Sequence, residues 1–275
     1  MTSEHYFPAF HKRALDKITL SDISRRLDAL KPESASRAKV LLNGFFVWCV
    51  RRGHCSQNPM VNVDEYKQGP GRDRVLTADE LRAVWTSVGQ DDFGRIVKLL
   101  ILTGCRRQEI GSLKWSEIDP QGVMTIPGER TKNHRAHTLT LPPMALDIIR
   151  EMPERVGNDH VFGERGNGFG SWHYGKATLK DGIEKEWRLH DLRRTVATKM
   201  AESPDDGGLG IQPHIIEALL NHSSGHKAGV AGIYNHAAYK AEIKTALLRW
   251  SHHVTNIVGI VDETENNVVP LKQSA

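Results

Sequence analysis

The chain has 275 residues, of which 39% are hydrophobic and 25% are charged, a composition typical of a globular protein with one large or two modest domains. Its apolar runs are far shorter than the ~18 residues that a transmembrane helix needs. A charge and a proline also interrupt the first residues, where a signal peptide has an apolar core. These features exclude a disordered chain and a membrane-spanning protein, and we expect a cytoplasmic protein without a membrane partner.

Basic charge is concentrated in the first quarter of the chain. Residues 1–75 carry more Lys and Arg than Asp and Glu, whereas the remainder is close to neutral. A local basic excess is typical of a nucleic-acid-binding surface. A solvated basic face would have the same composition, so charge alone leaves both interpretations open.

The spacing of apolar residues predicts two helices in residues 1–60. The first helix is capped by Thr19 or Ser21, and the second begins at Ser34 and ends just before Gly53. The predicted buried faces are Ile23, Leu27 and Leu30 in the first helix, and Val40, Leu41, Phe45 and Trp48 in the second. Residues 61–76 lack periodicity and contain Pro, Gly and mixed charge, which predicts a basic linker.

A second domain is expected over residues 77–260. It begins with a capping box at Thr77 and Glu80 and continues into an apolar central helix over 93–103, broken at Gly104. Two strands, 123–126 and 137–141, are joined by a charged turn. Further helices are predicted at about 143–151, 171–183, 191–202, 212–220 and 238–257, the last with a buried stripe of Ile243, Leu247, Trp250, Val254 and Ile257. Residues 261–275 form a tail. The predicted fold class is mainly α with a small β-sheet insertion.

Four short motifs and one tyrosine carry candidate functional groups in this domain. They are TGCRRQE at 103–109, TKN at 131–133, HDLR at 190–193, LLNH at 219–222, and Tyr234. Each motif alone also fits an ordinary structural role: Arg106 could pair with Glu109 one helical turn away, and Lys132 could be a solvated surface lysine. Only the combination points to one chemical task.

That task is attack on a phosphodiester without a metal ion. Arginine side chains bind the non-bridging phosphate oxygens in a bidentate manner and stay charged at any working pH. A tyrosine nucleophile has an ordinary pKa of about 10 and needs a base to remove its proton. A histidine can accept that proton, and a lysine can deliver one to the departing 5′ oxygen.

In this order, the motifs resemble those of the tyrosine recombinases, specifically the integrases of phages and genomic islands. The resemblance covers nearly the whole chain: residues from about Asp16 to Pro59 are similar to the later helices of a core-type DNA-binding domain, and residues from about 75 onward to a complete catalytic domain. It implies a site-specific DNA recombinase that cleaves and rejoins DNA through a covalent 3′-phosphotyrosyl intermediate, with no metal, ATP or other cofactor. Larger members of the family have a separate arm-type DNA-binding domain and a fuller core-binding domain, for which there is no room before Asp16, so the N-terminal domain is expected to be incomplete.

The resemblance also implies roles for individual residues. Arg106 and Arg193 would clamp the scissile phosphate, His222 would donate to a non-bridging oxygen, and Glu109 would support the arginine site. Family members usually have glycine where this chain has Asn221. Because asparagine is the next-best occupant of the left-handed region, we expect a positive φ at Asn221.

Three further residues would move protons or form the covalent bond. Lys132, in the turn between the strands, would be the general acid to the leaving 5′ oxygen. His190 would orient the phosphate and assist proton transfer. Tyr234 would become joined to the 3′ phosphate.

The expected partner is double-stranded DNA at a recombination core site. The family implies a homo-tetramer on DNA, to which residues after Trp250 could contribute, with accessory DNA-bending or directionality proteins and association with the nucleoid. Candidate phosphate-binding residues are Arg25, Arg26, Arg37, Lys39, Arg51, Arg52, Arg72 and Arg74.

Three other functions fit parts of the sequence: a metallohydrolase, a DNA-binding remnant of an integrase and a type IB topoisomerase. A metallohydrolase could use His222, His226, His236 and the pair His252-His253, but Ser-Ser-Gly separates the first two histidines and no carboxylate motif accompanies them. The three cysteines have no Cys-x-x-Cys spacing and are expected to be reduced thiols. A catalytically idle or truncated DNA-binding remnant of an integrase is the main alternative, and a type IB topoisomerase with similar chemistry is a minor one.

Overall fold

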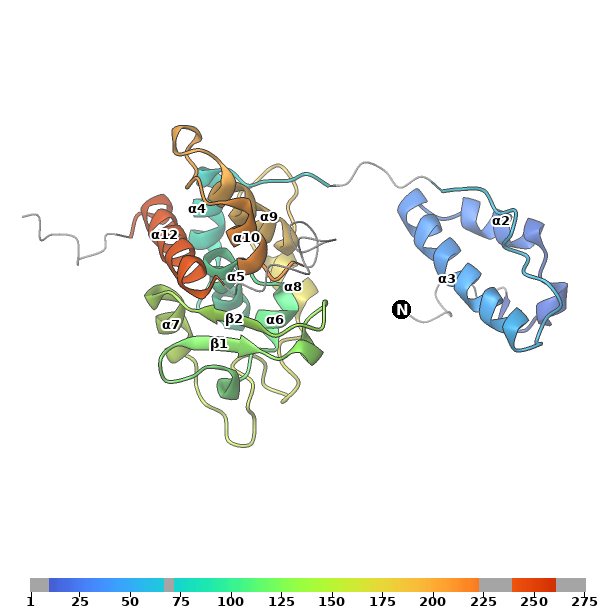
Figure 1. Cartoon of the computed structure of the whole chain (residues 1–275), viewed down its shortest axis with the longest axis horizontal. Coiled ribbons are helices and arrows are strands. Elements are labelled where there is room, and N and C mark those ends of the chain that lie inside the picture. Colours follow the sequence, from blue (N-terminus) through green and yellow to red (C-terminus); the bar gives the residue numbers. More distant parts are fainter. Residues whose placement is uncertain (1–9, 67–71, 223–238, 261–275) are drawn as a thin grey trace, which may run out of the picture. The chain divides into compact units, whose positions relative to one another are not determined.

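The computed structural model describes residues 10–66, 72–222 and 239–260, and the chain divides into two compact units between Asp73 and Arg74. Figure 1 shows the elements of each unit in chain order. No helix in these described ranges is long and apolar enough to cross a membrane. Each unit has its own hydrophobic core.

The N-terminal unit contains a short 3-10 turn, η2 (Leu15–Lys17), and two helices, α2 (Leu20–Asp28) and α3 (Pro32–Arg51). Thr19 caps α2, as predicted: its side chain accepts from the Asp22 backbone N–H, and the Asp22 side chain accepts from the Thr19 N–H. Helix α3 begins at Pro32 rather than Ser34, because proline is well suited to the first helical position. Gly53 follows the helix with a φ of 73°, as a C-terminal glycine should.

The predicted buried face of α3 is wrong. Val40, Leu41, Phe45 and Trp48 are exposed. The buried residues, which pack toward α2 and the following segment, are Ala35, Ala38, Leu42, Phe46 and Cys49. The helix carries apolar residues on more than one side, so hydrophobic periodicity could not select the inner face. The structure buries the row that contains two alanines, whose small side chains allow a close helix–helix approach.

The segment that links the two units is shorter than the predicted linker, residues 61–76. Met60 and Val63 are buried in the core of the N-terminal unit, and Tyr66 packs against the same core and donates from its hydroxyl to Asp28 Oδ1 (2.6 Å). At the other end, Arg74 and Leu76 are buried in the second unit. Both ends of the expected linker are therefore built into folded units.

The second unit is mainly helical with a two-stranded antiparallel sheet, which confirms the predicted fold class. Its first half contains α4 (Ala78–Ser87), α5 (Asp92–Thr103), α6 (Arg107–Gly111), η3 (Trp115–Glu117), β1 (Val123–Ile126), η4 (Gly128–Arg130) and β2 (His137–Thr140). Its second half contains α7 (Pro143–Arg150), α8 (Trp172–Thr178), α9 (Leu189–Ala201), η5 (Pro204–Asp206), α10 (Pro213–Leu219) and α12 (Lys240–Val258). In the sheet, Val123 lies opposite Thr140 and Ile126 opposite His137.

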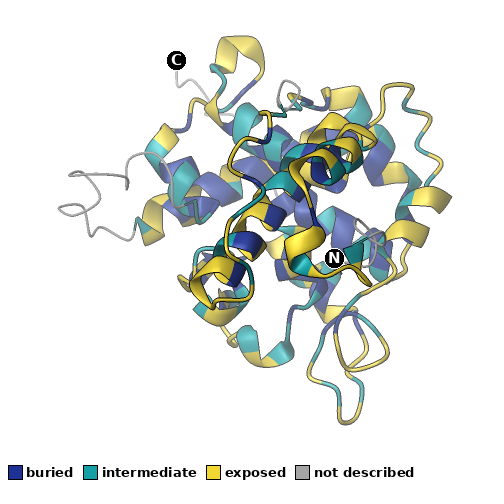
Figure 2. Cartoon of the chain, turned by 90° about the vertical axis from the view of Figure 1, so that its right-hand side faces the viewer, coloured by how far each residue is buried: buried dark blue, intermediate teal, exposed yellow. Residues whose placement is uncertain are grey.

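Helix α5 is the centre of this unit, and every residue from Leu99 to Thr103 is buried. It packs against α6, α7, α8, α9 and α12, and the burial colours of Figure 2 show the buried residues on the inward sides of the helices. The Trp250 indole N–H donates to the Ile101 carbonyl (2.7 Å), which fixes α12 against α5. The predicted apolar stripe of α12 is buried along its whole length.

Helix α8 is shorter than predicted and ends at Thr178. Beyond it, the Asp181 carboxylate accepts from the Ile183 backbone N–H (3.1 Å), and Gly182 has a φ of 70°. A side-chain-capped turn with a left-handed glycine competes with continuation of the helix. This turn brings residues 181–190 alongside the functional residues described below.

Candidate active site

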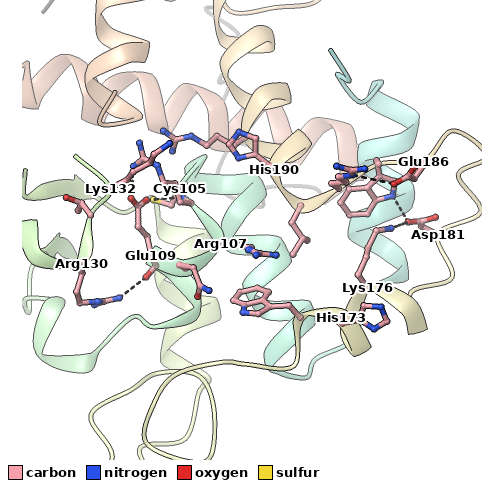
Figure 3. A pocket seen from close by; sticks show the side chains of 18 of the residues that line it. Cys105, Arg107, Glu109, Arg130, Lys132, His173, Lys176, Asp181, Glu186 and His190 are labelled. Atoms are coloured by element: carbon pink, nitrogen blue, oxygen red, sulfur yellow. Dashed lines mark hydrogen bonds and ion pairs between the residues drawn. The ribbon is translucent and has the colours of Figure 1, made fainter. Parts of the chain in front are cut away.

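Arg106, Glu109, Lys132, His190 and Arg193 line one cavity of about 1020 Å³. Figure 3 shows Lys132 and Glu109 on one side of this cavity, Lys176, Asp181 and Glu186 on the other, and His190 between the two groups. The structure thus brings together five residues that are dispersed over almost ninety positions of the sequence. His222 lies beside this group, and Tyr234 falls outside the described residues.

Gly104 directs the chain from α5 into the site. It has a φ of 64°, and its N–H bonds to the Leu100 carbonyl, which closes the end of the helix. A Cβ at this position would lie 2.9 Å from Leu220 Cδ2 and 3.1 Å from Val196 Cγ1. Only glycine fits both the backbone conformation and the space, so Arg106 follows α5 at a fixed place.

Glu109 holds Arg106. Its Oε1 accepts from Arg106 Nη1 (2.6 Å), and its Oε2 accepts from the Arg106 backbone N–H (2.8 Å). Burial alone would raise the pKa of Glu109, but the neighbouring His137 ring (Nδ1 to Oε2, 3.7 Å) and hydrogen bonds from the backbone and side chain of Arg106 lower it to about 2. The carboxylate is therefore ionised at neutral pH, and it both fixes and balances the guanidinium.

Three successive carbonyls at the end of α10 accept hydrogen bonds from residues around the cavity. The Leu219 carbonyl accepts from His137 Nε2 (2.7 Å), the Leu220 carbonyl from Arg193 Nη2, and the Asn221 carbonyl from Arg106 Nη2 (3.3 Å). The last carbonyls of a helix lack partners within it and carry partial negative charge. The carbonyls at the end of α10 therefore bind the guanidinium groups of Arg106 and Arg193 favourably.

Arg193 is almost completely buried. Besides the Leu220 carbonyl, it donates from Nη1 to the Gly104 carbonyl (2.6 Å). Burial, and next the positive charge of Arg106, lowers the pKa of Arg193 to about 10. Arg193 still carries its charge at neutral pH, so two cations face one cavity, and the buried Glu109 carboxylate is hydrogen-bonded to one of them, Arg106. That arrangement favours the binding of an anion.

The surroundings of His190 and His222 favour the neutral form of each imidazole. Burial lowers the pKa of His190, and the charges of Arg193 and Arg194 lower it further, although part of this residue is exposed at the cavity wall. Burial and the charge of Arg193 also lower the pKa of His222, against an opposing contact with Glu217 (Nδ1 to Oε1, 3.3 Å). A neutral imidazole can accept a proton at one nitrogen and donate one at the other.

Lys132 lies in the tight turn between β1 and β2. The Thr131 carbonyl accepts from the His134 N–H (3.3 Å), and His134 has a left-handed φ of 56°. Lys132 is exposed toward the cavity, and within the described ranges it has no hydrogen-bond or ion-pair partner. Its ammonium group is therefore available to a ligand.

Asn221 has a φ of 48°, which confirms the expectation for this position. Its side chain and carbonyl contact Asn133, the residue after Lys132, and sequence reasoning missed this pairing. It also missed His137, which bonds to the end of α10.

The cavity further contains Lys176, whose Nζ lies 3.8 Å from the centre of the Trp187 ring, and Asp181, which accepts from the Trp187 indole N–H (2.7 Å). Sequence reasoning did not identify these residues, and the only sequence feature that pointed to them is their closeness to the HDLR motif at 190–193.

Cys105, Glu109 and His137 place one potential metal-ligand atom each within 4.8 Å of one another. The donor set does not suit a metal ion, because both Glu109 oxygens already accept hydrogen bonds from Arg106. Burial raises the pKa of Cys105 to about 12, so its thiol stays protonated. All three cysteines of the chain are free thiols, as predicted.

The candidate phosphate-binding residues fall into different environments. Arg25, Arg37, Arg51 and Arg52 are exposed on the N-terminal unit, and Arg26 and Arg72 are partly buried. Lys39 pairs with Glu65 (2.5 Å). Arg74 is the exception: it is buried, pairs with Glu80 (2.5 Å) and donates to the Val75 carbonyl. Arg74 therefore closes the start of the second unit, and the expectation that it binds phosphate is corrected.

The Phage integrase family model matches residues 74–241. The chain belongs to the phage integrase family. Among curated members, it is 24% identical over 264 residues to Prophage integrase IntZ of Escherichia coli, covering 92% of this chain and 64% of IntZ. It is 27% identical over 263 residues to Tyrosine recombinase XerD of Listeria monocytogenes, covering 84% of each chain. This integrase thus spans less than two thirds of the length of IntZ.

Solved structures support the fold of this integrase. A lambda integrase dimer bound to a COC′ core site superposes with a TM-score of 0.59 at 22% identity, over 77% of this chain and 81% of that chain. A lambda integrase tetramer bound to a Holliday junction gives a TM-score of 0.58 at 21% identity, over 76% of this chain and 66% of that chain. The similarity shows a shared fold.

Proposed function

We propose that this integrase is a site-specific DNA recombinase that cleaves and rejoins DNA through a tyrosine. The observation that carries the proposal is the pair Arg106 and Arg193, anchored on successive carbonyls and facing the cavity that Lys132 also lines. Two fixed guanidinium groups suit the non-bridging oxygens of one phosphate. One such arginine is worth about 10³–10⁵ in rate in phosphoryl transfer.

In the proposed cleavage step, the Tyr234 hydroxyl oxygen attacks the scissile phosphorus. The phosphorus–5′ oxygen bond breaks as the tyrosyl–phosphorus bond forms. His190 accepts the tyrosine proton, and Lys132 gives a proton to the departing 5′ oxygen. Arg106, Arg193 and His222 stabilise the charge on the non-bridging oxygens.

Rejoining reverses these roles. A 5′ hydroxyl from a second duplex attacks the 3′-phosphotyrosyl bond, Lys132 takes back a proton, and tyrosine leaves with a proton from His190. The bond energy of the phosphodiester is kept in the phosphotyrosyl bond, so the reaction needs neither ATP nor another cofactor.

The proposed partner is double-stranded DNA at a recombination core site. Exposed basic residues of the N-terminal unit would bind its phosphates: Arg25, Arg37, Arg51 and Arg52. Arg26, Lys39 and Arg72 are also proposed to bind phosphate. Arg74 is not, because it is buried and paired with Glu80. We further propose assembly as a homo-tetramer on DNA, accessory DNA-bending or directionality proteins, and a cytoplasmic, nucleoid-associated location.

Trapping of the covalent adduct tests the proposal. The protein is mixed with supercoiled fragments of its source genome in EDTA and quenched with SDS, and the protein-linked DNA is sequenced. Adducts that disappear in Tyr234→Phe would identify the nucleophile, the independence from metal and the target sequence. Binding without any adduct would instead favour the DNA-binding remnant.

A further inference from the structure

Asn133 and Asn221 form a direct link between the turn that carries Lys132 and the end of α10. The Asn133 Nδ2 donates to the Asn221 carbonyl and to Asn221 Oδ1, both at 2.9 Å. In return, Asn221 Nδ2 donates to the carbonyl of Arg135, on the far side of the turn (3.1 Å). The two side chains thus hold both arms of the turn, and we call this arrangement the asparagine clasp.

The clasp continues into the turn itself. Asn133 Oδ1 lies 3.1 Å from the Thr131 hydroxyl and accepts from the Arg135 backbone N–H (3.3 Å). The Thr131 hydroxyl also accepts from the Arg135 N–H (3.1 Å). Lys132 lies between these bonded residues, so its backbone is fixed although its side chain extends freely toward the cavity.

The other end of the clasp is the carbonyl that Arg106 uses. The Asn221 carbonyl accepts from Asn133 Nδ2 and from Arg106 Nη2, so one oxygen joins the lysine turn to a phosphate-binding arginine. An asparagine at φ 48° is strained relative to glycine, which adopts this conformation freely. Glycine would keep the carbonyl but would lose both side-chain bonds to the turn. The asparagine therefore provides contacts that glycine cannot.

We propose that Asn133 and Asn221 are positioning residues that hold Lys132 at the leaving 5′ oxygen during DNA cleavage. The inference rests on the proposed function, in which Lys132 is the general acid. A turn tied to α10 through two amides fixes the Lys132 backbone relative to the carbonyls that hold Arg106 and Arg193, and this limits the region that the ammonium group can reach. Without the clasp, Lys132 samples more positions, and proton delivery slows while phosphate binding is retained.

A sulfur substitution in the DNA separates proton delivery from the other steps. The probe is the duplex recovered by trapping, synthesised with either an ordinary phosphodiester or a bridging 5′ sulfur at the scissile position. Sulfur departs as a thiolate and needs no general acid. General acid–base catalysis typically contributes about 10²–10⁴-fold, and we expect a mispositioned acid to lose at least about 10-fold of it.

Asn133→Ala and Asn221→Gly should therefore cleave the ordinary duplex at least about 10-fold more slowly than wild type. On the sulfur duplex, both should cleave within about 3-fold of wild type, because the lost step is no longer required. Asn256→Ala is the matched control, since it removes an exposed amide from α12 of the same unit. Equal slowing of the clasp variants on both duplexes would overturn the inference, because the clasp would then act on phosphate binding or folding.

Lys132→Ala distinguishes failure of the inference from failure of the proposed function. It should be slow on the ordinary duplex and restored on the sulfur duplex. If sulfur does not restore it, Lys132 is not the acid, and the positioning role falls with that assignment. If sulfur restores Lys132→Ala but not the asparagine variants, the acid assignment stands and the inference alone is wrong.

Hydrogen exchange on the full chain tests the clasp without DNA. The Arg135 N–H is bonded within the turn, and we expect its peptide, spanning residues 128–137, to exchange faster in Asn221→Gly than in wild type. Peptides from α12 should exchange at an unchanged rate. Unchanged exchange in the 128–137 peptide would show that the turn does not depend on the clasp, and would overturn the inference.

Discussion

The guanidinium of Arg193 donates to the carbonyl of Gly104, the residue that ends the helix before Arg106 (Nη1 to O, 2.6 Å). Its other terminal nitrogen donates to the Leu220 carbonyl. One buried side chain on α9 therefore joins the end of α5 to the end of α10. The two arginines of the site are positioned by the same pair of helix ends.

Arg193→Lys should reduce the cleavage rate by about 10³-fold, because an ammonium group cannot reach two carbonyls and a phosphate with the planar fork of an arginine. The measurement is single-turnover formation of the covalent adduct. Arg194→Lys, on the neighbouring position of the same helix, is the control and should stay within a few-fold of wild type. A similar loss in both variants would indicate damage to α9 rather than to phosphate binding.

Glu109→Gln should lower the free energy of unfolding by about 3 kcal/mol at pH 7, because it leaves Arg106 without its buried partner. Folding depresses the pKa of Glu109 to about 2. Its stabilisation is thus complete above the ordinary glutamate range and is lost as the pH falls from about 4.5 toward 2. Denaturant titrations at several pH values should show the difference between variant and wild type shrinking over that window.

Glu129→Gln is the control for this experiment, since Glu129 is exposed in the same part of the chain. It should change the free energy of unfolding by less than about 0.5 kcal/mol. A difference between Glu109→Gln and wild type that stays constant from pH 5 to pH 2 would contradict the role assigned to the carboxylate.

The free energy of unfolding should also fall as the pH is lowered below about 6.5. Folding lowers the pKa of His190 and His222, so the unfolded chain binds protons at a higher pH than the folded chain does. Stability is therefore greatest above the ordinary histidine pKa and declines below it. Urea titrations at pH 7.5 and 5.5 should show a smaller decline in His190→Gln and His222→Gln than in wild type. A decline as large in these variants as in His54→Gln, a change in the other unit, would exclude this explanation.

Replacing both Arg51 and Arg52 with Gln should flatten the salt dependence of DNA binding. Each phosphate contact that is lost removes about one unit from the slope of log binding constant against log salt concentration. Both residues are exposed at the end of α3. Arg150→Gln, an exposed arginine of α7 that pairs with Asp147, should leave the slope unchanged. If the double variant also keeps the wild-type slope, these residues do not bind phosphate.

Much of the fold was predictable because local signals agreed with the final packing. The cap at Thr19, one of two candidates, the capping box at Thr77, the break at Gly104 and the buried stripe of α12 all follow from short-range patterns. The inner face of α3 was not predictable, because Phe45 and Phe46 offer similar apolar area on adjacent sides of the helix. Only the tertiary contact with α2 decides that Phe46 is buried and Phe45 exposed.

In the candidate site, too, some features were predictable from local sequence and others depend on tertiary contacts. The motifs identified Arg106, Lys132, His190 and Arg193, which the structure places around one cavity. The contacts that hold them were not readable, because they join backbone carbonyls to residues far away in the chain. Asn133 belongs to the TKN motif and His137 to the predicted second strand, but nothing in the sequence links either residue to its partner at 219–221, which is found only when β1, β2 and α10 are folded together.

The carbonyls of residues 219–221 tie four side chains from three distant segments to one short helix. His137, Arg193, Arg106 and Asn133 all donate to these oxygens, and α10 itself is only seven residues long. A shift of this helix by a fraction of a hydrogen-bond length would disturb Arg106, Arg193 and the lysine turn simultaneously. The site is therefore assembled or dismantled as a whole, and substitutions of buried residues in α10, such as Ile215 and Ile216, would behave like simultaneous defects in several residues of the candidate site.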